Sequence, residues 1–284
     1  MGTAPIFPLD RVTIVGVVNL TPDSFSDGGR LLRSDGTPDV AAVLAAGRAL
    51  AEAGAGVLDI GGESTRPGAA PVPAALEIAR TLPAIEALAK ELDTKLSIDT
   101  RKASVAEAAL AAGARVVNDV SGLRHDPALA RVAAAAGAAL VLGHLRGEPA
   151  SMQREIHFDD VVCEVAAELA EAAARARALG FSGELLVDPG IGFGKRSAHN
   201  LALLANLAEL KRRVGLPVLV GPSRKSFLGE LTGDEVGERD LATAIVSGIA
   251  VFAGADALRV HDAGAARRAV ALGSALRAAR RPGA

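Results

Sequence analysis

Short apolar segments alternate with longer alanine- and leucine-rich stretches along nearly the whole chain. The short segments show little polar alternation, which is typical of parallel strands covered on both faces. We predict strands at residues 12–18, 56–60, 95–99, 115–119, 139–143, 184–188, 217–221 and 256–260. The stretches between them have helical spacing, most clearly at residues 40–53, 74–92 and 201–214.

Eight such β-then-α units, with no change of composition between them, predict a single (β/α)₈ TIM barrel spanning residues 1–284. A doubly wound open sheet is the alternative, but no Gly-x-Gly-x-x-Gly follows the first strand. Two loops, residues 19–39 and 61–73, are longer than usual. Both follow strand carboxyl ends, where barrels build active sites, so we expect them to act as lids.

Composition and charge exclude several classes of partner. The 284 residues are 50% hydrophobic and 23% charged, with a net charge of −2, so we expect no nucleic acid or anionic membrane as a partner. No apolar run reaches the roughly 18 residues of a membrane span, and the amino terminus lacks a signal-peptide pattern. The single cysteine, Cys163, excludes an intrachain disulfide. We expect it to be a buried structural thiol and the protein to be cytoplasmic.

Polar side chains gather where the predicted strands end. Burying them at the mouth of an apolar barrel is costly unless a ligand or mutual pairing satisfies them. These strand-end residues are Asn19, Asp99, Asn118, Asp119, His144, Asp188, Lys225, Arg259 and His261.

One group of these residues suits a flat heterocycle. Asp99, Asn118 and Asp188 offer hydrogen-bond acceptors, and Asn118 also offers an amide donor. Each residue alone is weak support, because Asp99 could instead cap the following helix and Asp188 could belong to a turn.

A second group suits an anion, such as a phosphate with a divalent metal. Arginine binds phosphate through two parallel hydrogen bonds, and barrel phosphate sites often use the last two loops. The group comprises Asn19, Arg66, Arg259 and His261, and Lys225 could serve either ligand.

Other polar residues are interpreted as structural. Asp119 and Asp262 are expected to cap helices or turns. Residues 190–195 (GIGFGK) lack the ending and spacing of a phosphate-binding P-loop. No Cys/His spacing indicates a zinc site, and surface or core positions are expected for His125, His157 and His199.

Several motifs, in order, resemble those of the dihydropteroate synthase family over residues 12–271. The two longest are residues 19–29 (NLTPDSFSDGG) and 59–68 (DIGGESTRPG). Shorter motifs lie at residues 98–100 (IDT), 118–119 (ND), 188–195 (DPGIGFGK), 223–226 (SRKS) and 259–262 (RVHD).

The resemblance implies that 4-aminobenzoate displaces diphosphate from a pterin methylene carbon, giving 7,8-dihydropteroate. It implies Asp99, Lys225 and Arg259 as catalytic residues. It implies pterin contacts by Asp99, Asn118, Asp188 and Lys225. It implies diphosphate contacts by Asn19, Thr65, Arg66, Arg259 and His261, with Mg²⁺ as cofactor and Asn19 as its ligand. It implies aminobenzoate contacts by Phe25, Pro67, Phe193 and Ser226, loop closure involving Asp27, and a homodimer.

These assignments are consistent with a dissociative reaction. The aryl amine is neutral at pH 7, so the difficult step is separating charge as the carbon–oxygen bond breaks. Cations and Mg²⁺ would neutralise the departing diphosphate, and the Asp99 carboxylate would stabilise a cationic methylene. A closed lid would keep water from trapping that cation.

Two other functions remain open from sequence. A methyltetrahydrofolate methyltransferase domain would share Asp99, Asn118 and Asp188 but would not need the anion residues, and an inactive pterin-binding paralogue would be expected to lack some of them. The chain departs from the family pattern at Leu145, where methionine is common, and at Pro222, where methionine or a small residue is common. It also has an additional polar stretch at residues 33–38.

Overall fold

Eight parallel strands form the ring predicted from the apolar segments. In the computed structural model, which describes residues 4–22 and 31–280, their order is β6-β5-β4-β3-β2-β1-β8-β7. A parallel bridge between Val187 and Val218 connects the two ends of the sheet. The strands are β1 (Thr13–Asn19), β2 (Val57–Gly61), β3 (Lys95–Asp99), β4 (Val116–Asp119), β5 (Ala139–Gly143), β6 (Leu185–Asp188), β7 (Leu219–Val220) and β8 (Ala257–Val260).

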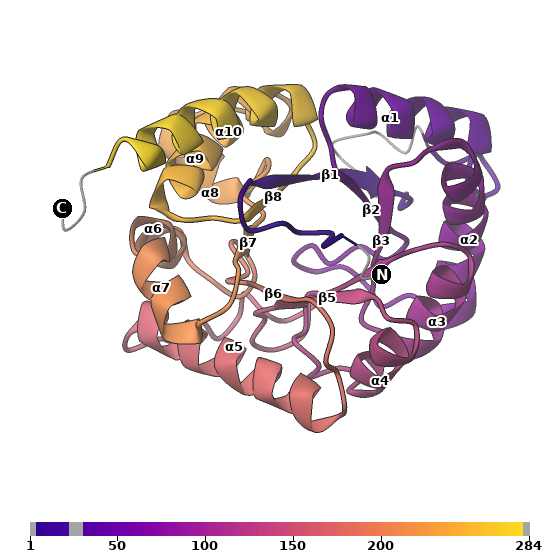
Figure 1. Ribbon diagram of the computed structural model, residues 1–284, viewed down its shortest axis with the longest axis horizontal. Helices are drawn as coiled ribbons and strands as arrows, with labels where there is room; N and C mark the ends of the chain where they lie inside the picture. The colour runs from indigo at the N-terminus through magenta and orange to yellow at the C-terminus, as the bar shows by residue number, and fades with distance from the viewer. Residues whose placement is uncertain (1–3, 23–30, 281–284) are drawn as a thin grey trace.

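Helices surround the strands (Figure 1), which confirms the TIM-barrel prediction. Residues 201–214, predicted as one helix, belong to two, which meet at Asn206 where φ is −110° and ψ is 28°. Within residues 4–22 and 31–280, no helix is both long and apolar enough to cross a membrane. The helices are α1 (Val40–Glu52), α2 (Ala74–Glu91), α3 (Ala103–Ala111), α4 (Ala128–Ala135), α5 (Val161–Ala178), α6 (Ser197–Ala205), α7 (Leu207–Val214), α8 (Ser226–Thr232), α9 (Asp240–Ala253) and α10 (Ala263–Ala278).

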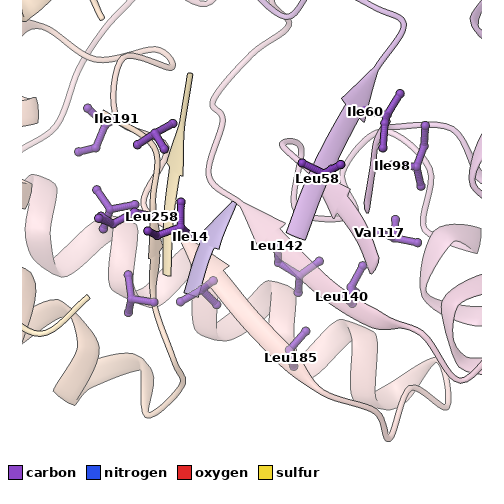
Figure 2. Close-up of a cluster of buried hydrophobic side chains, with 14 of the residues drawn as sticks. Ile14, Leu58, Ile60, Ile98, Val117, Leu140, Leu142, Leu185, Ile191 and Leu258 are labelled. Atoms are coloured by element: carbon purple, nitrogen blue, oxygen red, sulfur yellow. The ribbon is translucent and has the colours of Figure 1, made fainter. Parts of the chain in front are cut away.

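Alternate strand residues face the helices and the barrel interior. The outer layer contains strand residues such as Leu58, Ile98 and Leu140 (Figure 2), packed with helix residues in one continuous cluster. A separate inner cluster includes Val57 and Val116. The two clusters therefore make the barrel a solid apolar support for its polar mouth.

The amino-terminal segment closes the opposite end of the barrel, which faces the viewer in Figure 1. Phe7 joins the inner apolar cluster. The backbone N–H groups of Ile6 and Phe7 donate to the Glu184 carboxylate at 3.0 and 2.6 Å. Inward-facing polar groups near the carboxyl ends of the strands are therefore accessible only from the mouth at that end.

Strand register brings three of the predicted site residues to one level. Asn19 is aligned with Gly61, Gly61 with Asp99, and Asp99 with Asn118. Because side chains alternate, Asn118 faces inward whereas its neighbour Asp119 faces outward. The same alternation therefore separates a site residue from a structural one within a single dipeptide.

A third long connection accompanies the two that the sequence predicts. Residues 144–160 lie between β5 and α5. The backbone N–H of Gly68 donates to Pro149 O at 3.0 Å, which joins this connection to the loop after β2. The additional stretch at residues 33–38 forms a closed turn, with an antiparallel bridge between Leu32 and Pro38.

Gly143, at the end of β5, packs directly against backbone. A Cβ atom there would lie 2.6 Å from Val120 Cα, so Gly143→Ala should lower the free energy of unfolding by about 1–3 kcal/mol. Urea denaturation measures this change. Gly237→Ala is the control because nothing lies within 4 Å of its Cβ position, and equal losses in the two variants would contradict the packing argument.

Candidate active site

A cavity of about 490 Å³ opens at the carboxyl ends of the strands. Asn118 and Asp188 are not among the lining residues. Asn118 donates to Asp59, which pairs with the lining residue Arg259, and the Asp188 carboxylate lies beside the lining residue Gly221. Phe25 and Asp27 lie outside the described residues. The predicted site residues that line the cavity are Asn19, Thr65, Arg66, Pro67, Asp99, Phe193, Lys225, Ser226, Arg259 and His261.

The Arg259 guanidinium joins two acidic residues across the mouth. Its Nε lies 2.6 Å from Asp59 Oδ2, and its Nη2 lies 2.6 Å from Asp99 Oδ2. The heterocycle and anion sub-sites, which sequence reasoning treated separately, therefore share one cation. Asp99 does not cap the next helix, because Lys102 is the residue at the N-cap position of α3.

Asp59 is a site residue that sequence reasoning missed. It is fully buried in the middle of β2, and its Oδ2 also accepts from Asn118 Nδ2 at 3.0 Å. Its Oδ1 has no hydrogen-bond partner among the described residues. The available signal was a carboxylate within an apolar strand (VLDIG), because buried charges are normally paired.

Burial and crowding shift the protonation of these groups. Desolvation raises the pKa of Asp99 to about 7; Arg259 opposes this shift and Asp59 adds to it. Burial also raises the pKa of Asp188, against the effect of the Gly190 N–H that donates to it. Burial disfavours the charge on Arg259, but Asp59 and Asp99 outweigh that effect and raise its pKa.

His261 is a neutral imidazole surrounded by cations. Desolvation, followed by the charges of Arg224 and Arg259, lowers its pKa to about 3. Its Nδ1 lies 2.8 Å from Ser223 Oγ, which also accepts from the His261 backbone N–H at 3.2 Å. The buried Nε2 has no partner among the described residues. An Nε2–H would therefore be available to an anion in this cationic pocket.

Lys225 lies between the acids and an aromatic ring. Its Nζ is 4.0 Å from the centre of the Phe193 ring, a cation–π distance. Although the side chain is still partly exposed, desolvation and the charge of Arg259 lower its pKa to about 8. Lys225 is also the N-cap residue of α8, and Ser226 is the first residue of that helix. The start of α8 therefore positions both predicted residues.

Buried ion pairs anchor the loop that carries Thr65 and Arg66. Glu63, at the start of the loop, accepts from the Val72 N–H near its end at 2.9 Å. The other oxygen of Glu63 pairs with Arg101 at 3.4 Å and with Lys102 at 3.0 Å. The base of the loop is thus held in place while Pro67 at its tip is exposed.

The residues interpreted as structural have structural contacts. Asp119 accepts from the N–H groups of Ser121 and Leu123 at 2.8 and 2.6 Å. Asp262 caps α10 through the Ala265 N–H. Cys163 differs from expectation because it is half-buried on α5. Its hydrogen bond with Asp160 raises the thiol pKa, so the protonated and less reactive form is favoured.

No group of three or more His, Cys, Asp or Glu residues suited to a metal occurs among residues 4–22 and 31–280. The Asn19 side chain, half-buried on the cavity wall, offers a carbonyl oxygen. Mg²⁺ is often held by one or two protein oxygens together with substrate phosphates and water. The residues present therefore fit a metal that enters with its phosphate ligand rather than a preformed protein cage.

Comparison with known proteins agrees with this geometry. A family model described as "Pterin binding enzyme" matches residues 15–261, so the barrel and its mouth define a pterin-binding enzyme. Dihydropteroate synthase of Mycobacterium leprae is 46% identical over 262 residues, covering 89% of each chain. That of Escherichia coli is 40% identical over 255 residues, covering 89% of this chain and 88% of its own. The chain belongs to the dihydropteroate synthase family.

Solved structures give the same result. The Yersinia pestis dihydropteroate synthase in complex with a sulfonamide drug has a TM-score of 0.89 at 39% identity, covering 96% of both chains. The Xanthomonas albilineans enzyme with 4-aminobenzoic acid has a TM-score of 0.84 at 45% identity, covering 95% of this chain and 94% of that one. The whole barrel, rather than an isolated motif, is therefore shared.

Asp59→Asn tests the role of the buried carboxylate. The change keeps the side-chain size but removes the charge facing Arg259, so pterin affinity should fall about 10- to 100-fold. Isothermal calorimetry with a pterin ligand measures the loss. Asp119→Asn is the control, since Asp119 is equally buried but bonds only within its turn. It should lower stability and leave affinity unchanged; equal affinity losses would contradict the assignment.

Proposed function

We propose that this chain joins (7,8-dihydropterin-6-yl)methyl diphosphate to 4-aminobenzoate. The amine nitrogen forms a bond to the pterin methylene carbon, the carbon–oxygen bond to diphosphate breaks, and the amine gives up one proton. The observation that carries this proposal is one cavity lined both by the acid Asp99 and by the cations Arg66 and Arg259. Arg259 pairs there with Asp99 and with the buried Asp59. Such a cavity places opposite charges at the two ends of the bond that breaks.

The acidic side of the cavity is the proposed pterin site. Asp99, Asp188 and Asn118 would accept and donate along the polar edge of the ring, and Lys225 would reach a ring acceptor. The hydrogen bond from Asn118 Nδ2 to Asp59 supports this role, because it leaves the Asn118 carbonyl oxygen available as an acceptor. Amide orientation of this kind is set by the hydrogen-bond partner.

The cationic side is the proposed diphosphate site. Arg66, Arg259 and the His261 Nε2 would contact phosphate oxygens, and the Thr65 hydroxyl would donate from the anchored loop. Asn19 would bind Mg²⁺ through its carbonyl oxygen. Bound Mg²⁺ would neutralise negative charge on the diphosphate as it leaves.

Charge separation in a low-dielectric cavity is the proposed source of rate enhancement. As diphosphate leaves, the methylene carbon becomes positive, and the Asp99 carboxylate would stabilise it electrostatically. Phe193, Pro67 and Ser226 would hold the aminobenzoate. The neutral aryl amine would then attack without a dedicated base, and the loop at Thr65–Pro67 would exclude competing water.

We also propose that two copies of the chain associate through α9 and α10. These helices present an apolar surface with a shallow groove of about 270 Å³. Ile249 is 53% exposed, and Leu272 is 69% exposed. Gly248 and Gly273 let the two helices pack closely. A two-fold dimer would bury this same apolar face on both copies. The remaining exposed residues of this surface are Ile245, Phe252 and Leu276.

Asp99→Asn should lower kcat at least about 100-fold, because it removes the charge that opposes the cationic methylene. Diphosphate release in the presence of both substrates and Mg²⁺ measures the change. Asp262→Asn is the control, since Asp262 caps α10 and does not line the cavity. A kcat within a few-fold of the parent would reject the electrostatic role.

The same assay tests the reaction itself. Diphosphate release should require the pterin diphosphate, 4-aminobenzoate and Mg²⁺ together, and excess chelator should abolish it because the leaving group loses its neutralising ion. Release that depends on neither organic substrate would reject the proposed reaction.

Ile249→Glu should convert the dimer to a monomer, because a buried unpaired carboxylate destabilises an apolar interface. Light scattering after gel filtration measures the mass. Leu76→Glu is the control, since Leu76 is also an exposed aliphatic residue but lies on α2. An unchanged mass for Ile249→Glu, or a monomeric parent protein, would reject this interface.

A further inference from the structure

Lys195, at the end of the loop after β6, is buried without being part of the cavity wall. Its side chain points away from solvent, with the residue only 3% exposed. The ammonium nitrogen contacts Gly190 O at 3.0 Å, Phe193 O at 3.0 Å and His144 Nδ1 at 2.9 Å. A fourth acceptor, His144 O, lies farther away at 3.4 Å. Burial lowers the pKa of Lys195 to about 7. The protonated side chain has three N–H donors, so the three closest contacts match its donor capacity.

For Lys195 to donate all three hydrogen bonds, His144 must accept one of them at Nδ1. Burial, followed by the charge of Lys195, lowers the pKa of His144 to about 4. The proton of the neutral ring then lies on Nε2, which is 3.1 Å from Glu168 Oε2. Glu168 is paired with Arg124 and Arg146. His144, which the sequence grouped with the site, therefore faces away from the cavity and connects Lys195 to α5.

The loop that Lys195 binds carries part of the site. Asp188 begins it, and the Gly190 N–H donates to the Asp188 carboxylate at 2.8 Å. Phe193 presents its ring to Lys225. Gly190 has a φ of +67°, and a Cβ there would lie 2.0 Å from His144 O. The loop thus has no room to move toward β5, and its two bound carbonyl groups hold it there.

We propose that Lys195 is a positioning residue that sets the place of the Phe193 ring and so the affinity for the arylamine substrate. The inference rests on the proposed function, in which Phe193 contacts 4-aminobenzoate. Lys195 itself touches no substrate in this scheme. It acts by binding the carbonyl groups on both sides of the loop tip, so that Phe193 lies against Lys225 before the second substrate arrives.

Lys195→Met removes the donors and keeps much of the side-chain length. Without those donors, the three closest acceptors lose their partner and the loop tip should relax. We expect KM for 4-aminobenzoate to rise about tenfold, with kcat and the KM for the pterin diphosphate within about threefold of the parent. Steady-state kinetics with each substrate varied in turn separates these effects.

Lys211→Met is the matched control. Lys211 is half-buried and bonds Gly254 O at 3.2 Å and Asp256 at 2.7 Å. It lies on α7, and neither it nor these partners line the cavity. It should lower thermal stability and leave both KM values unchanged. A loss of kcat alone in Lys195→Met, with KM for 4-aminobenzoate unchanged, would overturn the proposal in favour of a purely structural role.

His144→Phe gives a second test if Lys195→Met does not fold. This change removes one acceptor and leaves the two loop carbonyl groups, so KM for 4-aminobenzoate should rise about threefold. An unchanged KM in this variant would also overturn the proposal. A parent protein that releases no diphosphate with both substrates would instead refute the proposed function, so the two failures are distinguishable.

Discussion

The mouth of this barrel depends on one guanidinium, that of Arg259, held between Asp59 and Asp99. The three side chains come from β8, β2 and β3, so their contacts exist only once the sheet has curved into a barrel. Without the cation, two carboxylates would face each other in a poorly solvated space, where like charges repel strongly. With it, the acidic and cationic halves of the cavity become one electrostatic unit.

That unit also explains the unusual protonation around it. The cations near His261 keep its imidazole neutral, so it can offer a directed N–H instead of another positive charge. Lys225 and Asp99 have pKa values shifted toward neutrality by burial and by their neighbours. Each shift reflects a group whose charge the neighbouring residues compensate incompletely. Binding of a substrate with the complementary charge would relieve this cost.

The loops around the cavity are more strongly tied down than their length suggests. Glu63 holds both ends of the segment containing Thr65 and Arg66, while Lys195 binds the loop containing Phe193. Both anchors are ionisable side chains with little exposed surface, and each bonds to more than one partner. A buried charge tolerates few alternative arrangements because each unpaired state is costly. The loops can therefore present side chains in defined places although they have little regular structure.

The sequence by itself determined the barrel, because buried parallel strands leave apolar runs that local composition reveals. It also located most cavity residues, because strand ends and side-chain alternation place them at the mouth. The family motifs indicated which ligand each of these residues would contact. Only the tertiary structure decided that Arg259 pairs with Asp59, that Lys195 turns inward to His144, and that α9 and α10 expose a joint apolar face. It also showed that residues 201–214, predicted as one helix, belong to two helices. These features depend on contacts between residues far apart in the chain, such as the 200 positions that separate Asp59 from Arg259, and such contacts are set by barrel closure rather than by any local pattern.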